Sequence, residues 1–191
     1  MKILYLGPEK LHIIDFLRAF GDEVVQIEHE INELREVSEY DFIISYGYRH
    51  VINKQIVDIF NRKAINLHIS YLPWNRGADP NLWSFLEDTP KGVTIHYIDK
   101  GLDTGDIIVQ KTVEFSNTET LRTSYEKLVA EIEKLFMENW LDIRSGRITP
   151  IPQTGKGTFH RKSDKLKWEY LLTKGWDTPV AELIGKAKWG E

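Results

Sequence analysis

The apolar and polar positions in the first third of the chain predict alternating strands and helices. Short buried strands are expected at residues 2–6 and 23–27, with a helix at residues 9–20 between them, because its apolar side chains recur at helical spacing. Residues 28–39 are acidic and only weakly periodic, and beyond them strands at 42–45 and 64–68 flank a short helix at 53–60. Strands that alternate with crossover helices predict a parallel sheet.

The second half of the chain completes this sheet and covers it. Two runs rich in β-branched residues, 92–98 and 106–113, are separated by a turn and predict an antiparallel or mixed edge. The longest helical pattern, 118–143, begins near Asn117 or Thr118 as a capping residue, and its apolar face is expected to cover the sheet. The predicted fold class is therefore α/β, with a mainly parallel twisted sheet flanked by helices.

The pattern weakens from Pro150 onward into Pro, Gly and charged residues. Residues 1–150 are predicted to form one domain, because a chain of 191 residues is most simply a single domain with its own core. Residues 151–191 are predicted to be a tail that packs on this domain or extends from it, and not a second domain.

Composition and charge exclude several classes of function. The chain has no Cys, which rules out disulfides, thiolate nucleophiles and Cys-ligated zinc, and a cytoplasmic location is expected. The net charge of −4 gives no electrostatic footprint for nonspecific nucleic-acid binding, and no apolar run approaches membrane-spanning length. The loop after the first strand, L-G-P-E-K-L-H, lacks both a dinucleotide fingerprint and a Walker lysine. Neither nucleic acid nor membrane is therefore an expected partner.

Three polar residues have the chemistry of an acid–base site. Asn66 and His68 stand two positions apart in an expected strand, so their side chains point to the same face. Asp103 follows in a turn bracketed by Gly101 and Gly105, which permit a tight backbone path toward the imidazole. A neutral His can accept a proton near physiological pH, and an Asn amide can stabilise an oxyanion. Taken singly, each residue is more often a satisfied buried hydrogen-bonding group or a turn cap.

The sequence motifs around these residues resemble those of the formyltransferases that use 10-formyltetrahydrofolate. The matching motifs, over about residues 40–115, are N-x-H, S-x-L-P-x-x-R-G-x-x-P, G-V-T-x-H and D-x-G-x-D-T-G. The resemblance implies a Rossmann-like core, 10-formyltetrahydrofolate as co-substrate, and Asn66, His68 and Asp103 as the catalytic set. In the implied mechanism an acceptor amine attacks the formyl carbon, Asn66 and protonated His68 stabilise the oxyanion, and Asp103 assists proton removal. No metal is required.

The resemblance also places a pocket for the flat pterin ring of the folate. Residues 45–52 are expected to build one wall and residues 98–103 the other, although residues 46–49 also fit an ordinary exposed loop after a strand. The residues assigned to the folate are Tyr46, Gly47, Tyr48, Arg49, His50 and Val51 in the first wall, and Ile98 and Leu102 in the second.

The acceptor is expected near the loop that follows the N-x-H strand. Trp74, Asn75, Arg76 and Asn81 are the candidate binding residues, and Arg76 suits either an acceptor phosphate or a role as a structural pin. His96 and Gly105 are assigned supporting roles, and core packing is favoured for Trp83. A basic cluster at residues 159–165 suits an anionic acceptor, but a solvated charge run is the simpler interpretation.

The resemblance leaves several acceptors open. Glycinamide ribonucleotide transformylases have a Gly- and Ser-rich phosphate loop that L-G-P-E-K-L-H does not match, and methionyl-tRNA formyltransferases carry a C-terminal barrel for which the residues after Pro150 leave too little room. The loop L-P-W-N-R-G-A-D-P-N-L-W-S is similar to that of enzymes that formylate a nucleotide-linked amino sugar. This acceptor is predicted, with a homodimer as the candidate assembly. The rivals are a formyltetrahydrofolate hydrolase and a noncatalytic folate- or sugar-binding module.

Overall fold

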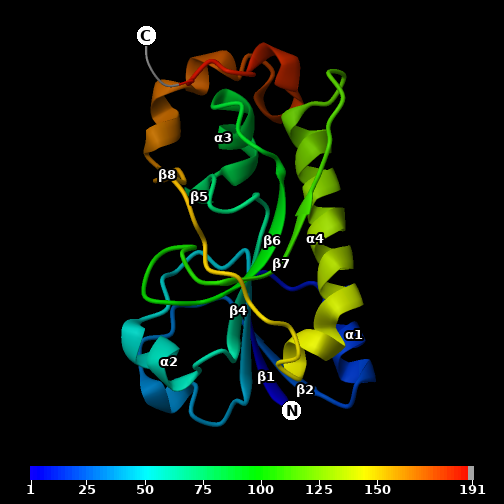
Figure 1. Ribbon diagram of the computed structural model, residues 1–191, viewed down its shortest axis with the longest axis vertical. Coiled ribbons are helices and arrows are strands. Elements are labelled where there is room, and N and C mark those ends of the chain that lie inside the picture. Colours follow the sequence, from blue (N-terminus) through cyan, green and yellow to red (C-terminus); the bar gives the residue numbers. More distant parts are fainter. Residues whose placement is uncertain (189–191) are drawn as a thin grey trace.

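A computed structural model describes residues 1–188, so the last three residues of the predicted tail lie outside the described residues. Its centre is a six-stranded sheet in the order β2-β1-β3-β4-β6-β7, in which β1 to β4 run parallel, β6 is antiparallel to β4, and β7 is antiparallel to β6 (Figure 1). The predicted mainly parallel sheet with an antiparallel edge is confirmed. The strands are β1 (Lys2–Leu6), β2 (Glu23–Ile27), β3 (Phe42–Tyr46), β4 (Ala64–His68), β6 (Gly92–Tyr97) and β7 (Ile107–Thr112).

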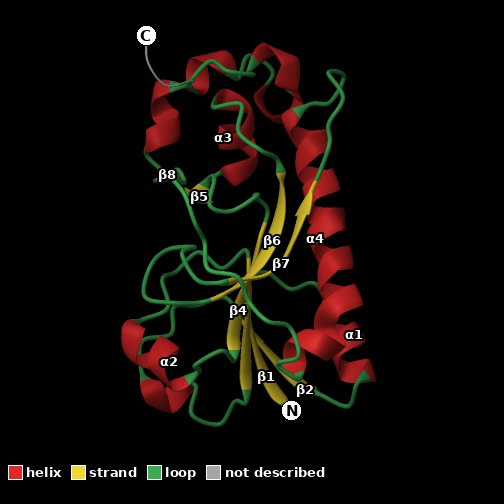
Figure 2. Ribbon diagram, in the orientation of Figure 1, coloured by secondary structure: helices red, strands yellow, loops and turns green. Residues whose placement is uncertain are grey.

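Helices cover both faces of this sheet (Figure 2). Helices α1 (Leu11–Ala19) and α4 (Leu121–Arg144) lie over one face, and α2 (Lys54–Ile59) lies over the other. The strand alternation divides the core accordingly: Ile65 and Leu67 of β4 pack in the α1 and α4 layer, whereas Ala64 packs with α2. Within residues 1–188, no helix is long and apolar enough to cross a membrane.

The expected helices are present, with shifted starts. Asn53 caps α2, because its side chain accepts hydrogen bonds from two backbone N–H groups of the first turn. The predicted caps of α4, Asn117 and Thr118, are wrong. Thr120 caps this helix through a reciprocal pair of bonds with Thr123, which satisfies an N–H group at each of the two positions.

Two elements in the upper half of Figure 1 were not expected from the sequence. Residues Pro80–Leu86 form a third helix, α3, and a two-stranded parallel sheet joins β5 (Arg76–Gly77) to β8 (Phe159–His160). The tail then packs on α3 and on the start of α4 through short 3₁₀ turns. Trp83 of α3 is buried and stacks on His160 with ring centroids 3.7 Å apart, which confirms its expected packing role. The division into domain and tail stays a prediction.

The strand order reverses between β1 and β3. Open α/β sheets bind ligands beyond the carboxyl ends of the strands at such a reversal. The loops after β1 and β3 approach closely there: a Cβ on Gly7 would lie 2.0 Å from the carbonyl oxygen of Tyr46. The carboxyl end of β4, which carries His68, lies beside this crevice, because β4 is the neighbour of β3.

Candidate active site

Strand pairing brings three of the expected residues together. Asn66 and His68 share one face of β4, and the antiparallel register places His96 of β6 directly opposite Asn66. A register irregularity between Ile95 and His96 interrupts the pairing of β6 with β7 at this point. Bulges of this kind commonly re-aim side chains near functional sites. His96, which is 2% exposed, is thereby part of the cluster and not merely near it.

The loop before β7 carries Asp103 to the same place. Asp103 has a φ of 55°, in the left-handed region, and Gly105 approaches the chain so closely that a Cβ there would lie 1.9 Å from the Tyr97 carbonyl oxygen. The backbone N–H of Gly77 donates to Asp103 Oδ2 at 2.8 Å. The loop is thus folded back onto the sheet, and the supporting role of Gly105 stays a prediction.

The Asp103 carboxylate lies at the centre of the cluster. Its Oδ1 accepts a hydrogen bond from Asn66 Nδ2 at 3.0 Å and lies 3.4 Å from His96 Nε2, while its Oδ2 lies 3.8 Å from His68 Nδ1. Asn66 Nδ2 also lies 3.2 Å from His96 Nε2, so both N–H groups of the amide are taken up within the cluster. An incoming oxyanion would have to displace one of these two contacts to reach the Asn66 donor.

The contacts of His68 identify which ring nitrogen can take up a proton. Nε2 lies 3.1 Å from the backbone carbonyl oxygen of Asn75, and because a carbonyl only accepts, Nε2 carries a hydrogen. In the neutral ring Nδ1 is therefore the unprotonated nitrogen, and it faces Asp103. A proton accepted at Nδ1 would create an imidazolium beside a carboxylate, which stabilises the charged form.

Asp103 is held in its ionised form. Burial alone raises the pKa of this carboxyl, but the neighbouring His68 and His96 rings and the N–H of Gly77 together hold the pKa well below its ordinary value of 3.8. The arrangement can accept and pass on a proton, and it can stabilise positive charge on an imidazole.

The first expected folate wall is only partly formed by side chains. The expected contact of the Tyr46 side chain with folate is wrong. Its ring lies in the α1 and α4 layer and its hydroxyl donates to Glu133 of α4, so only its backbone can face a ligand on the α2 side. Tyr48 lies on the α2 side, but its hydroxyl accepts from Ile31 N and donates to His29 O. The remaining members of this wall are exposed or partly exposed: Gly47, Arg49, His50, Val51 and Ile52.

The second expected wall has accessible apolar groups. Leu102 is 45% exposed and Val51 of the facing loop is 71% exposed, although both are apolar, whereas Ile98 packs partly into the α2 layer. Exposed apolar side chains on two loops beside a catalytic cluster are consistent with contact to a ligand. The assignment of these residues to folate stays a prediction.

The expected acceptor residues are mostly committed to the protein itself. Asn75 is fully buried and its amide bonds to Glu87, Thr158 and Thr89, so it is a structural residue and not a ligand contact. Arg76 directs two N–H groups at Gln153 Oε1, at 3.1 and 2.6 Å, which is the contact expected of a structural pin. Its assignment to the acceptor stays a prediction.

Asn81 is likewise committed, although it borders a cavity. Its amide donates to the Leu121 carbonyl at 3.0 Å and accepts from Ser124, and thereby ties α3 to α4. Trp74 is half-buried, and its assignment to the acceptor stays a prediction.

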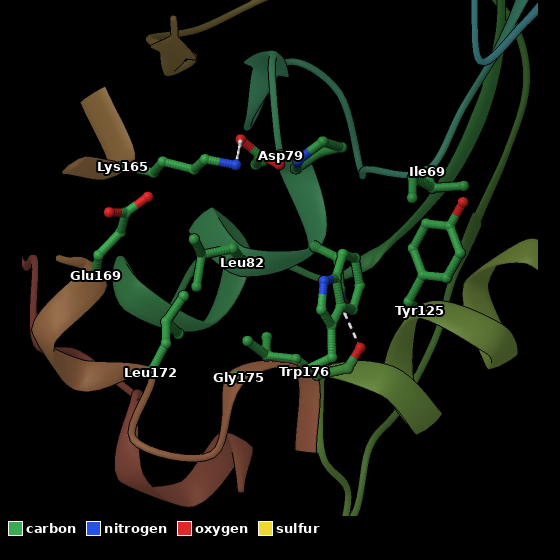
Figure 3. Close-up of a pocket in the computed structure, with 12 residues that line it drawn as sticks. Ile69, Asp79, Leu82, Tyr125, Lys165, Glu169, Leu172, Gly175 and Trp176 are labelled. Carbon is green, nitrogen blue, oxygen red and sulfur yellow. Dashed lines mark hydrogen bonds and ion pairs between the residues drawn. The ribbon is translucent and has the colours of Figure 1, made fainter. Parts of the chain in front are cut away.

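A cavity of about 300 Å³ lies between α3, the start of α4 and the tail (Figure 3). Ile69 and Tyr125 stand at one end, Lys165 and Glu169 at the other, and the Trp176 ring lies between them. Glu169 and Trp176 were not predicted to bind a ligand, because they lie in a tail whose weak periodicity gives no sign of what it packs against. Gln153 was missed for the same reason. Tyr125 lies on α4, where a single aromatic residue does not indicate a ligand.

The chain matches known proteins along most of its length. The sequence model of the Formyl transferase family matches residues 16–139. A methionyl-tRNA formyltransferase from Thermodesulfovibrio yellowstonii is 36% identical over 80% of this chain, and the chain spans about half, 51%, of that relative.

Solved structures give closer matches in fold. The formyltransferase PseJ from Anoxybacillus kamchatkensis, crystallised with UDP-4,6-dideoxy-4-formamido-L-AltNAc and tetrahydrofolate, is 60% identical with a TM-score of 0.97, covering 98% of this chain and 100% of that chain. A 4-N formyltransferase from Francisella tularensis is 24% identical with a TM-score of 0.76, covering 87% and 78%, which shows the fold alone. With a family match over residues 16–139 and a cluster of Asn66, His68 and Asp103 at the end of β4, the chain belongs to the formyl transferase family.

Proposed function

We propose that this protein is an N-formyltransferase that moves the formyl group of 10-formyltetrahydrofolate to the amine of a nucleotide-linked amino sugar. The observation that carries the proposal is the 60% identity, over the full length of both chains, to a formyltransferase crystallised with a UDP-linked 4-formamido sugar and tetrahydrofolate. The acceptor we propose is therefore a UDP-linked 4-amino-4,6-dideoxy sugar. The methionyl-tRNA formyltransferases are more distant relatives, at 36% identity.

The cluster supports this chemistry because each step has a group in place. The neutral amine attacks the formyl carbon, and negative charge develops on the formyl oxygen. The ionised Asp103 and the free Nδ1 of His68 are positioned to take the proton that the amine loses. The resulting imidazolium stabilises the oxyanion, and so does the Asn66 amide after one of its N–H groups leaves the Asp103 carboxylate. The C–N bond to the folate then breaks, and the folate nitrogen leaves with the proton that the imidazolium returns.

The two sides of β4 offer separate approaches for the two substrates. The loops assigned to folate lie on the α2 side, where Tyr48, Ile52 and Ile98 pack. The cavity lies on the other side, against Tyr125 of α4. We propose that folate enters from the α2 side and the acceptor from the cavity side, so that amine and formyl carbon meet at the end of β4.

The cavity is suited to the nucleotide half of the acceptor. Trp176 is 54% exposed and meets Tyr125 edge to face, with ring centroids 5.5 Å apart, so an aromatic surface is available to a flat base. Lys165 Nζ lies 3.3 Å from Asp79 Oδ2 at the cavity wall and is the nearby cation for a diphosphate. Arg122 of α4 bonds Asp177, which holds the turn that presents Trp176.

Replacing Trp176 with Ala is expected to raise the Michaelis constant for the sugar nucleotide about tenfold, since stacking on a base contributes about 1–3 kcal/mol. The Michaelis constant for the folate should change less than about twofold. Tyr170→Ala is the matched control, because Tyr170 is a 72% exposed aromatic of the same tail that does not line the cavity. Equal effects of the two variants on the Michaelis constant for the sugar nucleotide would contradict the assignment of the nucleotide to this cavity.

An acceptor panel tests the proposal itself. The protein is incubated with 10-formyltetrahydrofolate and, separately, UDP-linked amino sugars, glycinamide ribonucleotide and initiator methionyl-tRNA. We expect a formyl mass increment on a UDP-linked 4-amino sugar and none on the other two. Formylation of the tRNA with the amino sugars inert would contradict the acceptor while leaving formyl transfer intact.

A homodimer and a cytoplasmic location belong to the same proposal as predictions. The partners we propose are small molecules, a folate and a UDP-sugar, because the 60% identical relative was crystallised with ligands of these two kinds. Light scattering on the purified protein would measure the oligomeric state directly.

A further inference from the structure

Gln153, in the segment between α4 and β8, bridges the two loops that build the catalytic cluster. Its Nε2 donates to the backbone carbonyl of Asp103 at 2.9 Å and to that of Gly105 at 2.8 Å. Its Oε1 accepts one hydrogen bond from Nε and one from Nη2 of the Arg76 guanidinium. The segment that carries Gln153 crosses the molecule from the foot of α4 to β8 (Figure 1).

Both the amide nitrogen and the amide oxygen of Gln153 form hydrogen bonds. Two donors at one end meet two carbonyls, and the acceptor at the other end meets a guanidinium fork, so the orientation of the amide is determined. A carboxylate at this position would keep the pairing with Arg76 but would face two carbonyl oxygens without a donor. An apolar side chain would lose all four contacts.

The same segment also holds the loop that supports His68. Thr158 accepts from Asn75 N through its hydroxyl and from Arg76 N through its carbonyl, and β8 pairs with β5. That loop supplies the Asn75 carbonyl that fixes the His68 ring and the Gly77 N–H that binds Asp103. Residues 153–160 therefore contact the backbone of Asp103 directly, and they hold the loop at residues 75–77 that contacts His68.

We propose that Gln153 is a positioning residue for catalysis, held in place by Arg76, that keeps the Asp103 carboxylate against His68. Asp103 depends on such support because its backbone is in the left-handed region, at a φ of 55°. A shift of this carboxylate alters the geometry of proton transfer without altering either binding surface. The proposal rests on the proposed formyl transfer.

The test compares Gln153→Met with Gln110→Met. Gln110 is a matched control because it is also a half-buried Gln whose amide donates to a backbone carbonyl, that of Leu72, and it makes no contact with Asp103. We expect Gln153→Met to lower turnover at least tenfold, with both Michaelis constants within about twofold of wild type. Gln110→Met should lower turnover less than about threefold at a similar loss of melting temperature. Equal losses of turnover in the two variants would reduce Gln153 to a structural residue.

Arg76→Ala provides an independent arm. Because the guanidinium orients Gln153, this variant should also lower turnover and leave the Michaelis constant of the sugar nucleotide unchanged, and combining it with Gln153→Met should add little. A rise confined to the Michaelis constant of the sugar nucleotide would instead identify Arg76 as a phosphate contact and overturn the proposal.

Hydrogen exchange separates this proposal from the proposed function. In Gln153→Met, backbone amides in residues 99–106 should exchange faster than in wild type, while those of β4 should not change. Unchanged exchange in residues 99–106 would contradict the positioning role. If this region is loosened but the wild-type protein formylates no acceptor in the panel, the proposed function fails while the contact of Gln153 with this loop stands.

Discussion

Replacement of Asp103 with Asn is expected to lower turnover about a thousandfold, the largest effect of any single change at the site. The variant keeps the shape of the side chain but loses the charge that faces His68 at 3.8 Å and accepts from Asn66 and Gly77. Steady-state kinetics with both substrates measures the loss. Binding of a stable folate analogue at wild-type strength would show that the fold and the folate site survive. Turnover within tenfold of wild type would remove Asp103 from the chemistry.

The depressed pKa of Asp103 adds a pH dependence to this comparison. A carboxyl whose pKa is lower in the folded state stabilises the fold above its unfolded value of 3.8, and this stabilisation is lost as the pH falls through the lower folded value. The free energy of unfolding of wild type minus that of Asp103→Asn should therefore shrink below about pH 4. A difference that stays constant through this range would show that the charge of Asp103 does not stabilise the fold.

His68→Asn is expected to lower turnover about a hundredfold or more, because the ring nitrogen that takes up the proton is removed. The Asn side chain is smaller and polar, so folding should be retained at this buried position, which thermal unfolding would verify. His12→Asn is a suitable control, since His12 is a half-exposed His on α1 that pairs with Glu133 away from the cluster. If both variants kept near-normal turnover, the role of His68 in proton transfer would be wrong.

The regular part of the fold was predictable because its signals are local. Buried strands such as Phe42–Tyr46 and Ala64–His68 are apolar runs of strand length, and each was placed within a residue of its observed ends. Helix α3 was missed because Pro80–Leu86 is short and almost wholly buried, so it has no polar face to set a helical period. The start of α4 was misplaced because several residues around Thr118 have the chemistry of a cap.

The meeting of the candidate catalytic residues was predictable because they lie in a sequence motif, whereas the residues that support them were not predictable. Asn66, His68 and Asp103 meet as expected, and His96 joins them through strand register. Gln153 lies far along the chain in a segment without periodicity, and only tertiary structure places its amide against the Asp103 loop. Arg76 forms a structural pin, one of the two roles expected for it, but the sequence could not name its partner, because this side chain lies far along the chain.

Isotope labelling tests the central claim, formyl transfer to an amine, most directly. The protein is supplied with 10-formyltetrahydrofolate carrying ¹³C in the formyl group and with a UDP-linked 4-amino-4,6-dideoxy sugar, and the label is followed by NMR and mass spectrometry. The account predicts that the label appears as a formamide on the sugar amine, with tetrahydrofolate released in equal amount. Recovery of the label as free formate would identify a hydrolase, and label that stays on a bound folate would identify a noncatalytic binding module; either result would contradict the account.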